Sequence, residues 1–247
     1  MRTKHYYVFD EQITDKFNGN SLNQTNWDVL RESVENEDFG IEESIERYET
    51  YNASREDIRR RAELVLDVLD GNGLSHKRIV SLGVGKAVLE WYIKRLRPEI
   101  TVECTDYARK GVEKLKTVFH SADNIFVFDM MNGDYSDFAD SVVMIYRIST
   151  EFDKKQWIDI FQKMFDSGIT DIIFVPTELA SVKYVLMQKK SHIANLVKRK
   201  KEIECGWIFS ESEFYRMFKG NRNHSIYSIT QRVLIDETAL YLLKKTN

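Results

Sequence analysis

The chain has 247 residues, of which 43% are hydrophobic and 30% are charged, and its formal net charge is −3. This composition excludes a disordered or fibrous chain, and the two cysteines are too few for a disulfide framework. No apolar stretch approaches the length of a membrane-spanning helix, and the N-terminal residues lack the apolar core of a signal peptide. We therefore expect a soluble, cytoplasmic protein with no membrane partner, and the mildly acidic balance makes nucleic acid an unlikely partner.

The N-terminal part of the chain is polar and turn-rich, which is typical of loops and short helices. Ser54 opens a pattern that resembles a capping box, with an acid at Asp57, and apolar residues follow at helical spacing until Gly71. We expect residues 1–77 to form a helical N-terminal cap over the remaining domain, residues 78–247.

From Arg78 onward, short apolar runs alternate with amphipathic segments of helical period. Such alternation predicts a parallel sheet covered by helices on both faces. The five expected strands are 78–82, 100–106, 124–129, 141–147 and 171–176, and the expected helices between them are about 86–97, 108–119 and 153–165.

The C-terminal part has a different pattern. A long helix over about 178–200 leads to a second capping-box pattern at 210–213 and a short helix. The two strands that follow, 225–236 and 238–245, have almost nothing between them, so they must pair antiparallel, because a parallel return needs a crossover connection. The sequence thus predicts an α/β fold whose parallel strands are followed by an antiparallel hairpin.

Glycines and acids stand at the ends of the first three predicted strands. Gly83 and Gly85 follow the first strand, Asp106 ends the second and Asp129 ends the third. Ligands of open α/β sheets bind at these ends, where glycines allow a sharp turn and the next helix offers free N–H groups. Asp106 could accept the hydroxyls of a ribose and Asp129 the exocyclic amine of an adenine. Each residue alone could equally belong to a tight turn or a helix cap, but the ordered set favours a ligand site.

Residues 78–245 resemble the class I S-adenosylmethionine-dependent methyltransferases. The resemblance implies a Rossmann-like, doubly wound, seven-stranded sheet that is mostly parallel and has a C-terminal antiparallel hairpin, and it implies S-adenosylmethionine as the cofactor. The segments that carry it are VSLGVGKA (80–87), ECTDYA (103–108), VFDMM (127–131), SVVMIYRIS (141–149) and FDSGITDIIFVPTE (165–178).

The resemblance also implies a set of cofactor-binding residues, and this chain departs from the family pattern at two of the loop positions. Ser81 stands where the family has an acid; it can still accept one hydrogen bond from the ammonium group but supplies no charge. Ala87 replaces the third glycine. Lys86, unusual in this loop, could pair with the cofactor carboxylate or point into solvent. The implied cofactor-binding residues are Ser81, Gly83, Gly85, Asp106, Tyr107, Asp129, Met130 and Tyr146.

The acceptor should bind near the ends of the fourth and fifth strands and under the N-terminal cap. Tyr146 and Glu151 are the first candidates for orienting or deprotonating it, although Glu151 could also serve only as helix N-terminal charge. The aromatic content of the cap and the lack of excess positive charge favour a small molecule, methylated at oxygen or nitrogen. Further candidates are Arg147, Glu178, Tyr48 and Tyr51.

Two other functions remain open. A nicotinamide-dependent dehydrogenase would suit the spacing from the glycines to Asp106, but Gly83-x-Gly85-x-x-Val88 lacks the third glycine of that fingerprint, and the hairpin and Asp129 favour the methyltransferase. A non-catalytic S-adenosylmethionine-binding protein would keep the fold without the reaction. The five histidines are dispersed, so no metal site is predicted, and the oligomeric state is left open. The basic run 198–201 is interpreted as a solvated helix end.

Overall fold

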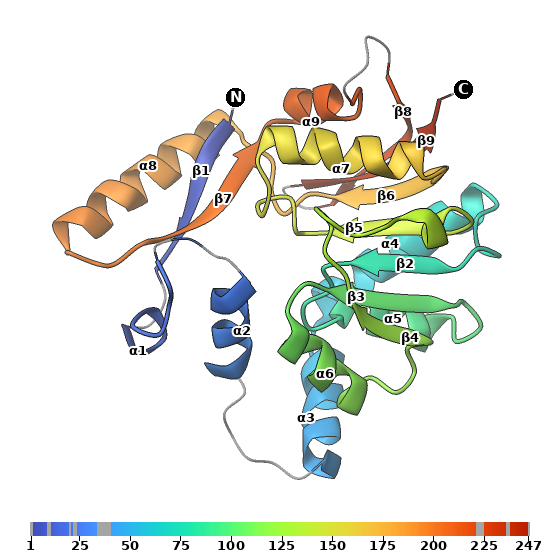
Figure 1. Ribbon diagram of the computed structural model, residues 1–247, viewed down its shortest axis with the longest axis horizontal. Helices are drawn as coiled ribbons and strands as arrows, with labels where there is room; N and C mark the ends of the chain where they lie inside the picture. The colour runs from blue at the N-terminus through green and yellow to red at the C-terminus, as the bar shows by residue number, and fades with distance from the viewer. Residues whose placement is uncertain are drawn as a thin grey trace.

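A seven-stranded sheet forms the centre of the computed structural model, with strand order β4-β3-β2-β5-β6-β9-β8 (Figure 1). The structure describes residues 2–8, 11–19, 21, 24–33, 41–220, 225–235 and 238–246. Neighbouring strands run parallel except that β9 is antiparallel to both β6 and β8. The strands are β2 (Ile79–Leu82), β3 (Val102–Asp106), β4 (Asn124–Val127), β5 (Val142–Tyr146), β6 (Asp171–Val175), β8 (Tyr227–Ile235) and β9 (Thr238–Lys245).

This topology confirms the predicted fold class. The chain builds β2, β3 and β4 outward in one direction and then returns to place β5 and β6 on the other side of β2. The direction therefore reverses between β2 and β5, and a ligand crevice is expected outside the carboxyl ends of these two strands. The closing hairpin is formed by β8 and β9 as predicted; residues 236–237 of its connection lie outside the described residues.

Helices cover both faces of the sheet, and this explains why the parallel strands read as continuous apolar runs. All four residues of β2 are buried; Ile79 belongs to the core on one face and Val80 to the core on the other. One face packs against α4 (Glu56–Gly71), α5 (Val88–Leu96) and α6 (Arg109–Val118). The other packs against the 3₁₀ helix η1 (Ser136–Phe138), α7 (Lys154–Asp166) and α9 (Glu211–Met217).

A second, two-stranded sheet lies beside the first. Strand β1 (Arg2–Tyr7) pairs antiparallel with β7 (Ile203–Phe209), and α8 (Val182–Val197) lies next to β1 (Figure 1). The expectation of a purely helical cap is therefore wrong for β1, and β7 was not predicted, because neither strand has its partner nearby in sequence. Helices do form elsewhere in the cap, as α1 (Glu11–Thr14), α2 (Gln24–Ser33), α3 (Ile41–Ala53) and α4.

Of the two predicted capping boxes, the one at 210–213 is present, where Ser210 caps α9 with Glu213. A further capping box joins Asp153, at the start of α7, to Gln156. Ser54 does not cap α4: α3 runs almost to this residue, and the Ser54 N–H and hydroxyl both donate to carbonyls of the last turn of α3. The N-cap of α4 is Arg55, without a side-chain hydrogen bond. Among the described helices, none combines the length and apolar character needed to cross a membrane.

Candidate functional site at the carboxyl end of the sheet

The loop after β2 adopts left-handed backbone conformations at three alternate positions. The φ angles of Gly83, Gly85 and Ala87 are +67°, +58° and +52°. A Cβ at Gly83 would lie 2.9 Å from the Cδ1 of Ile148, so this position requires glycine on two grounds. Ala87, where the family has its third glycine, keeps the glycine-like conformation with its methyl group fully buried.

Asp106 at the end of β3 holds this loop in place. Its Oδ2 accepts a 2.8 Å hydrogen bond from the backbone N–H of Gly85, and its Oδ1 accepts a 2.9 Å bond from the N–H of Ala108 at the start of α6. One carboxylate thus joins the glycine loop to the N-terminus of the next helix. The structure brings together two of the segments that the sequence analysis assigned to one site.

A buried carboxylate lies beneath the same loop. The hydroxyl of Ser81 donates a 2.5 Å hydrogen bond to Oε1 of Glu90, in the first turn of α5, and both side chains are buried. The pKa of Glu90 is raised to about 7, mainly by burial; the Ser81 hydrogen bond lowers it, and the nearby charge of Asp106 raises it to a smaller extent. Glu90 was not predicted from the sequence. It is an acid within the apolar run that follows the glycine loop, and this pattern could have identified it as a candidate.

Asp129 lies at the end of β4, next to the end of β3, where the N–H of Phe128 donates to the Asp106 carbonyl over 3.1 Å. Its carboxylate closes its own turn: Oδ1 accepts from the backbone N–H groups of Met131 (2.8 Å) and Asn132 (3.3 Å), and Oδ2 accepts from the Asn132 side chain (2.9 Å). Of the neighbouring predicted residues, Met130 is buried and Tyr107 is exposed.

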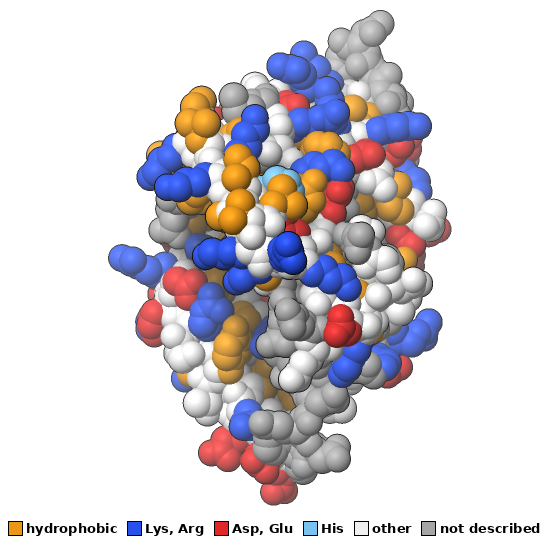
Figure 2. Space-filling model, turned by 90° about the vertical axis from the view of Figure 1, so that its left-hand side faces the viewer, with side chains coloured by type: hydrophobic (Ala, Val, Ile, Leu, Met, Phe, Trp, Pro, Cys, Tyr) orange, Lys and Arg blue, Asp and Glu red, His pale blue; other side chains and the backbone are white. Residues whose placement is uncertain are grey.

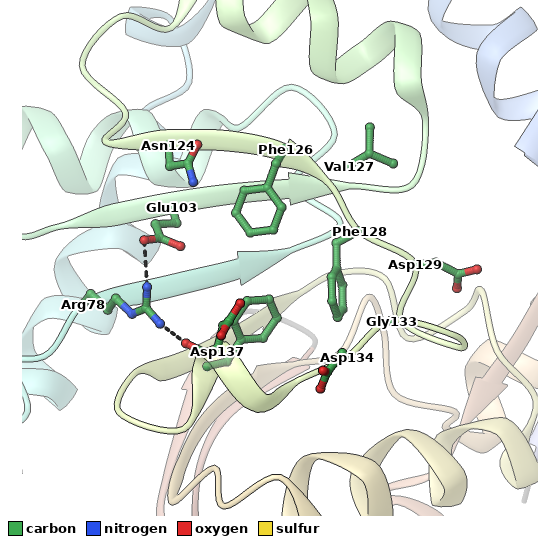
Figure 3. A pocket seen from close by; sticks show the side chains of 11 residues that line it. Arg78, Glu103, Asn124, Phe126, Val127, Phe128, Asp129, Gly133, Asp134 and Asp137 are labelled. Carbon is green, nitrogen blue, oxygen red and sulfur yellow. Dashed lines mark hydrogen bonds and ion pairs between the residues drawn. The ribbon is translucent and has the colours of Figure 1, made fainter.

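Asp129 also borders a pocket of about 610 Å³ on the sheet face over β3 and β4 (Figure 3). The rings of Phe126 and Phe128 line its middle, whereas Asp129 lies at one end (Figure 3). At the other end, Arg78 forms a 2.9 Å ion pair with Glu103. The lining residues run from Asp129, after the carboxyl end of β4, to Arg78 and Asn124 near the amino ends of the strands, and they include Asp137 and Phe138 of η1.

The loop after β5 receives contacts from the N-terminal part of the chain. The Tyr146 hydroxyl accepts a 2.8 Å hydrogen bond from Nη1 of Arg61 in α4. Glu151 accepts hydrogen bonds from Nε1 of Trp27 in α2 (3.2 Å) and from the Thr150 hydroxyl (3.3 Å), and it borders a cavity of about 200 Å³. Tyr146 and Glu151, the two candidates for orienting the methyl acceptor, are thus bonded to different helices of the cap, α4 and α2.

A cavity of about 380 Å³ lies between β1, α8 and the loop after β6. Glu178 contributes its carboxylate, whose Oε2 is buried without a hydrogen-bond partner among the described residues. The Tyr184 hydroxyl lies 3.3 Å from Nδ1 of His5 and accepts a 2.8 Å bond from Gln188. Burial lowers the pKa of His5, and burial together with Glu178 raises the pKa of Tyr184. Burial and the charge of Glu178 raise the pKa of Tyr7, and the charge of Arg147, the residue after β5, lowers it.

Helix α3 of the cap contacts the glycine loop directly. The Tyr48 hydroxyl donates a 3.1 Å hydrogen bond to the Lys86 carbonyl, and the Lys86 ammonium lies 4.6 Å from the ring centroid of Tyr51. Lys86 therefore makes a cation–π contact that the sequence did not predict. Within the described ranges, no His, Cys, Asp and Glu side chains gather in a group of three or more that could hold a metal ion; His224 lies outside those ranges.

Comparison with known proteins gives structural matches alone: no protein-family model matches the sequence, and no curated protein matches it. Magnesium protoporphyrin IX methyltransferase from Synechocystis PCC 6803, with bound SAH, is 13% identical with a TM-score of 0.59, over 96% of this chain and 100% of that one. Mitomycin 7-O-methyltransferase is 13% identical with a TM-score of 0.56, over 96% of this chain and 67% of that one.

A protein assigned as a zinc-dependent alcohol dehydrogenase from Rhodobacter sphaeroides is 10% identical with a TM-score of 0.52, over 69% of this chain and 85% of that one. Its match leaves more of this chain uncovered than the two methyltransferase matches do. At identities this low the likeness concerns the fold alone. The strand order and the closing hairpin, together with the two methyltransferase matches, give this protein the class I methyltransferase fold.

Proposed function

We propose that this protein transfers the methyl group of S-adenosylmethionine to an oxygen or nitrogen atom of a small organic acceptor. The observation that carries the proposal is the arrangement after β2, where Gly83 and Gly85 have positive φ and Asp106 bonds the Gly85 N–H. These groups stand outside the carboxyl ends of the strands, at the reversal of strand order where ligands of such sheets bind. In this proposal Asp106 and Tyr107 contact the ribose side of the cofactor, and Asp129 and Met130 the adenine side.

Glu90 supplies the negative charge that Ser81 lacks. The cofactor carries an ammonium group and a sulfonium, and a buried carboxylate beside the glycine loop stabilises positive charge of this kind more than an exposed one does. Without a ligand, burial makes the charged form of Glu90 unfavourable, as its raised pKa indicates. Keeping this acid buried lowers the stability of the ligand-free protein when the acid is charged. A buried acid of this kind at the edge of a predicted site is typical of a functional residue.

The acceptor is proposed to bind where the loops after β5 and β6 meet the N-terminal segment. S-adenosylmethionine supplies an already activated methyl group, so the protein mainly aligns the acceptor with it. The acceptor oxygen or nitrogen would attack the methyl carbon as the bond from that carbon to the sulfonium sulfur breaks, which leaves S-adenosylhomocysteine, and the proton that the acceptor loses would go to a carboxylate within hydrogen-bond reach. Tyr146 and Glu151 remain the first candidates for orienting or deprotonating the acceptor. Glu178 is a further candidate base, because its buried Oε2 has no hydrogen-bond partner within the described ranges.

Calorimetry with S-adenosylhomocysteine tests the cofactor directly. We expect the intact protein to bind S-adenosylhomocysteine and to bind a nicotinamide dinucleotide at least tenfold more weakly. The reverse order of affinities would favour the dehydrogenase, and the absence of S-adenosylhomocysteine binding would contradict the proposal.

A second experiment separates catalysis from binding. Protein and methyl-labelled S-adenosylmethionine are incubated with a pool of small metabolites and, separately, with RNA. Label in the metabolite pool supports the proposal, label in RNA alone would contradict the small-molecule acceptor, and binding without any transfer would favour a non-catalytic protein. Unchanged turnover in Tyr146→Phe and Glu151→Gln would remove both residues from the acceptor site.

A further inference from the structure

Helix α8 turns a polar face toward the rest of the molecule. Gln188 donates a 2.8 Å hydrogen bond to the buried Tyr184 hydroxyl, and Asn195 donates a 2.7 Å bond to Glu202. His192, on the same face, bonds Glu202 and stacks on the ring of Tyr6 in β1. The side of α8 that faces the β1–β7 sheet therefore carries polar side chains, and Tyr184 and His192 on it contact His5 and Tyr6 of β1.

The outward face of α8 is apolar. Five side chains on it are between 60% and 79% exposed, although an ordinary surface helix buries its apolar side chains against the core. Their spacing places them along one side of the helix. We call them the α8 apolar stripe: Val182, Leu186, Ile193, Leu196 and Val197.

Positive charge surrounds this stripe. The segment 179–201 contains seven Lys and Arg residues and no Asp or Glu, although the chain as a whole has a net charge of −3. Figure 2 shows hydrophobic side chains lying among Lys and Arg side chains on this face of the molecule. The exposed cations are Lys183, Lys189, Lys190, Lys198, Arg199 and Lys200.

We propose that the α8 apolar stripe and the cations around it bind the surface of a membrane that contains anionic lipids. Apolar side chains enter the boundary between headgroups and acyl chains, while nearby Lys and Arg side chains bind anionic headgroups. A second copy of this chain would bring two strongly positive segments together, and a nucleic acid would leave the stripe unused. The sequence-based expectation of no membrane partner rested on the lack of a membrane-spanning apolar stretch. Binding to the membrane surface does not require such a stretch.

Flotation of the full chain with lipid vesicles tests the proposal. We expect binding to vesicles of 70% phosphatidylcholine and 30% phosphatidylglycerol, about tenfold weaker binding to pure phosphatidylcholine, and weaker binding in high salt because screening reduces the electrostatic part. The apolar variant Leu186→Ser/Ile193→Ser and the charge variant Lys189→Glu/Lys190→Glu should each lower the partition coefficient about tenfold.

Matched substitutions elsewhere control for general effects on the protein. Leu234→Ser replaces a leucine that is 67% exposed on β8, and Lys116→Glu/Lys219→Glu reverses two exposed lysines outside α8. Both controls should bind vesicles as the unchanged chain does. No binding to the anionic vesicles, or equal losses in the controls, would overturn the proposal. So would RNA binding that depends on Lys189 and Lys190 without vesicle binding, or self-association that Leu186→Ser/Ile193→Ser abolishes.

Discussion

The hydroxyl of Ser81 donates a 2.5 Å hydrogen bond to the carboxyl group of Glu90, and both side chains are buried. Ser81 lies at the position of an acid in the methyltransferase pattern, and this acidic side chain of α5 stands one hydrogen bond away from it. Because this carboxyl group is buried, its protonation makes the stability of the protein depend on pH. The affinity for a cationic ligand that contacts it should depend on pH for the same reason.

Glu90→Gln should stabilise the ligand-free protein at high pH. Glu90 titrates near 4.5 in the unfolded chain and near 7 in the folded protein, so the folded state binds more protons between these values. The free energy of unfolding therefore falls as the pH rises through this interval, by up to about 3 kcal/mol. Urea denaturation should find Glu90→Gln about 2–3 kcal/mol more stable than the unchanged chain at pH 8, with the difference shrinking toward pH 5.

The exposed Glu46→Gln provides the control for this experiment, because its environment is solvent. Its stability difference should stay the same across the pH range. If Glu90→Gln behaved in the same way as Glu46→Gln, the buried carboxylate would not be the linked group.

Affinity for S-adenosylhomocysteine should rise with pH in the same interval. The proposed contact needs the charged form of Glu90, whose pKa is about 7, so binding should be about tenfold tighter at pH 8 than at pH 6. Calorimetry should find this dependence lost in Glu90→Gln, together with about a tenfold loss of affinity at pH 8. Binding of 5′-methylthioadenosine, which lacks the amino-acid part, should be unaffected; equal losses for both ligands would show that Glu90 only shapes the loop.

Asp106→Ala should weaken binding of S-adenosylhomocysteine about tenfold to a hundredfold. The substitution removes the proposed ribose contact and the bond to the Gly85 N–H, and a hydrogen bond to a charged group contributes about 1.5–3 kcal/mol. Calorimetry measures the loss, and Asp140→Ala, which replaces an exposed aspartate outside the pocket lining, serves as the comparison. Unchanged affinity in Asp106→Ala would exclude Asp106 from the cofactor site.

Gly206→Ala should unfold part or all of the protein. Gly206 has a φ of +95°, and a Cβ there would lie 1.6 Å from the Thr150 carbonyl oxygen, so the backbone itself must move. We expect a loss of about 3 kcal/mol or more in urea denaturation. Gly168→Ala shares the positive φ of +87°, but its nearest neighbour is the Ala139 Cβ at 3.8 Å; it should lose only about 1 kcal/mol. Similar losses in the two variants would contradict the predicted clash.

Asp153→Ala should cost about 1 kcal/mol of stability. Its side chain accepts a 2.8 Å hydrogen bond from the Gln156 N–H, while the Gln156 side chain accepts from the Asp153 N–H over 2.7 Å, which completes the cap of α7. Urea denaturation measures the loss, and Lys155→Ala, exposed on the same helix, should change stability by less than about 0.5 kcal/mol.

The central sheet was predictable because its signals are local. The middle strands β2, β5 and β6 are short, mainly apolar runs, since both of their faces are covered, and the interval between strands fits one helix. The cap of α7 at Asp153 and the antiparallel pairing of β8 with β9 follow from residues a few positions apart. The order of strands and acids along the chain was also enough to suggest which residues stand at the carboxyl edge of the sheet.

The rest depends on partners that are distant in sequence. Strand β1 forms because β7, about 200 residues later, offers it an edge, and Gly206 has the conformation it has because the Thr150 carbonyl lies against it. The hydrogen bond between Ser81 and Glu90 depends on the direction in which α5 runs after the glycine loop. The residue types alone do not specify that direction. The sequence by itself determined where strands and helices occur and which acids end the strands, because those properties depend on near neighbours. Only the tertiary structure decided which side chains meet and which face of α8 is left outside, because these depend on packing between elements far apart in the chain.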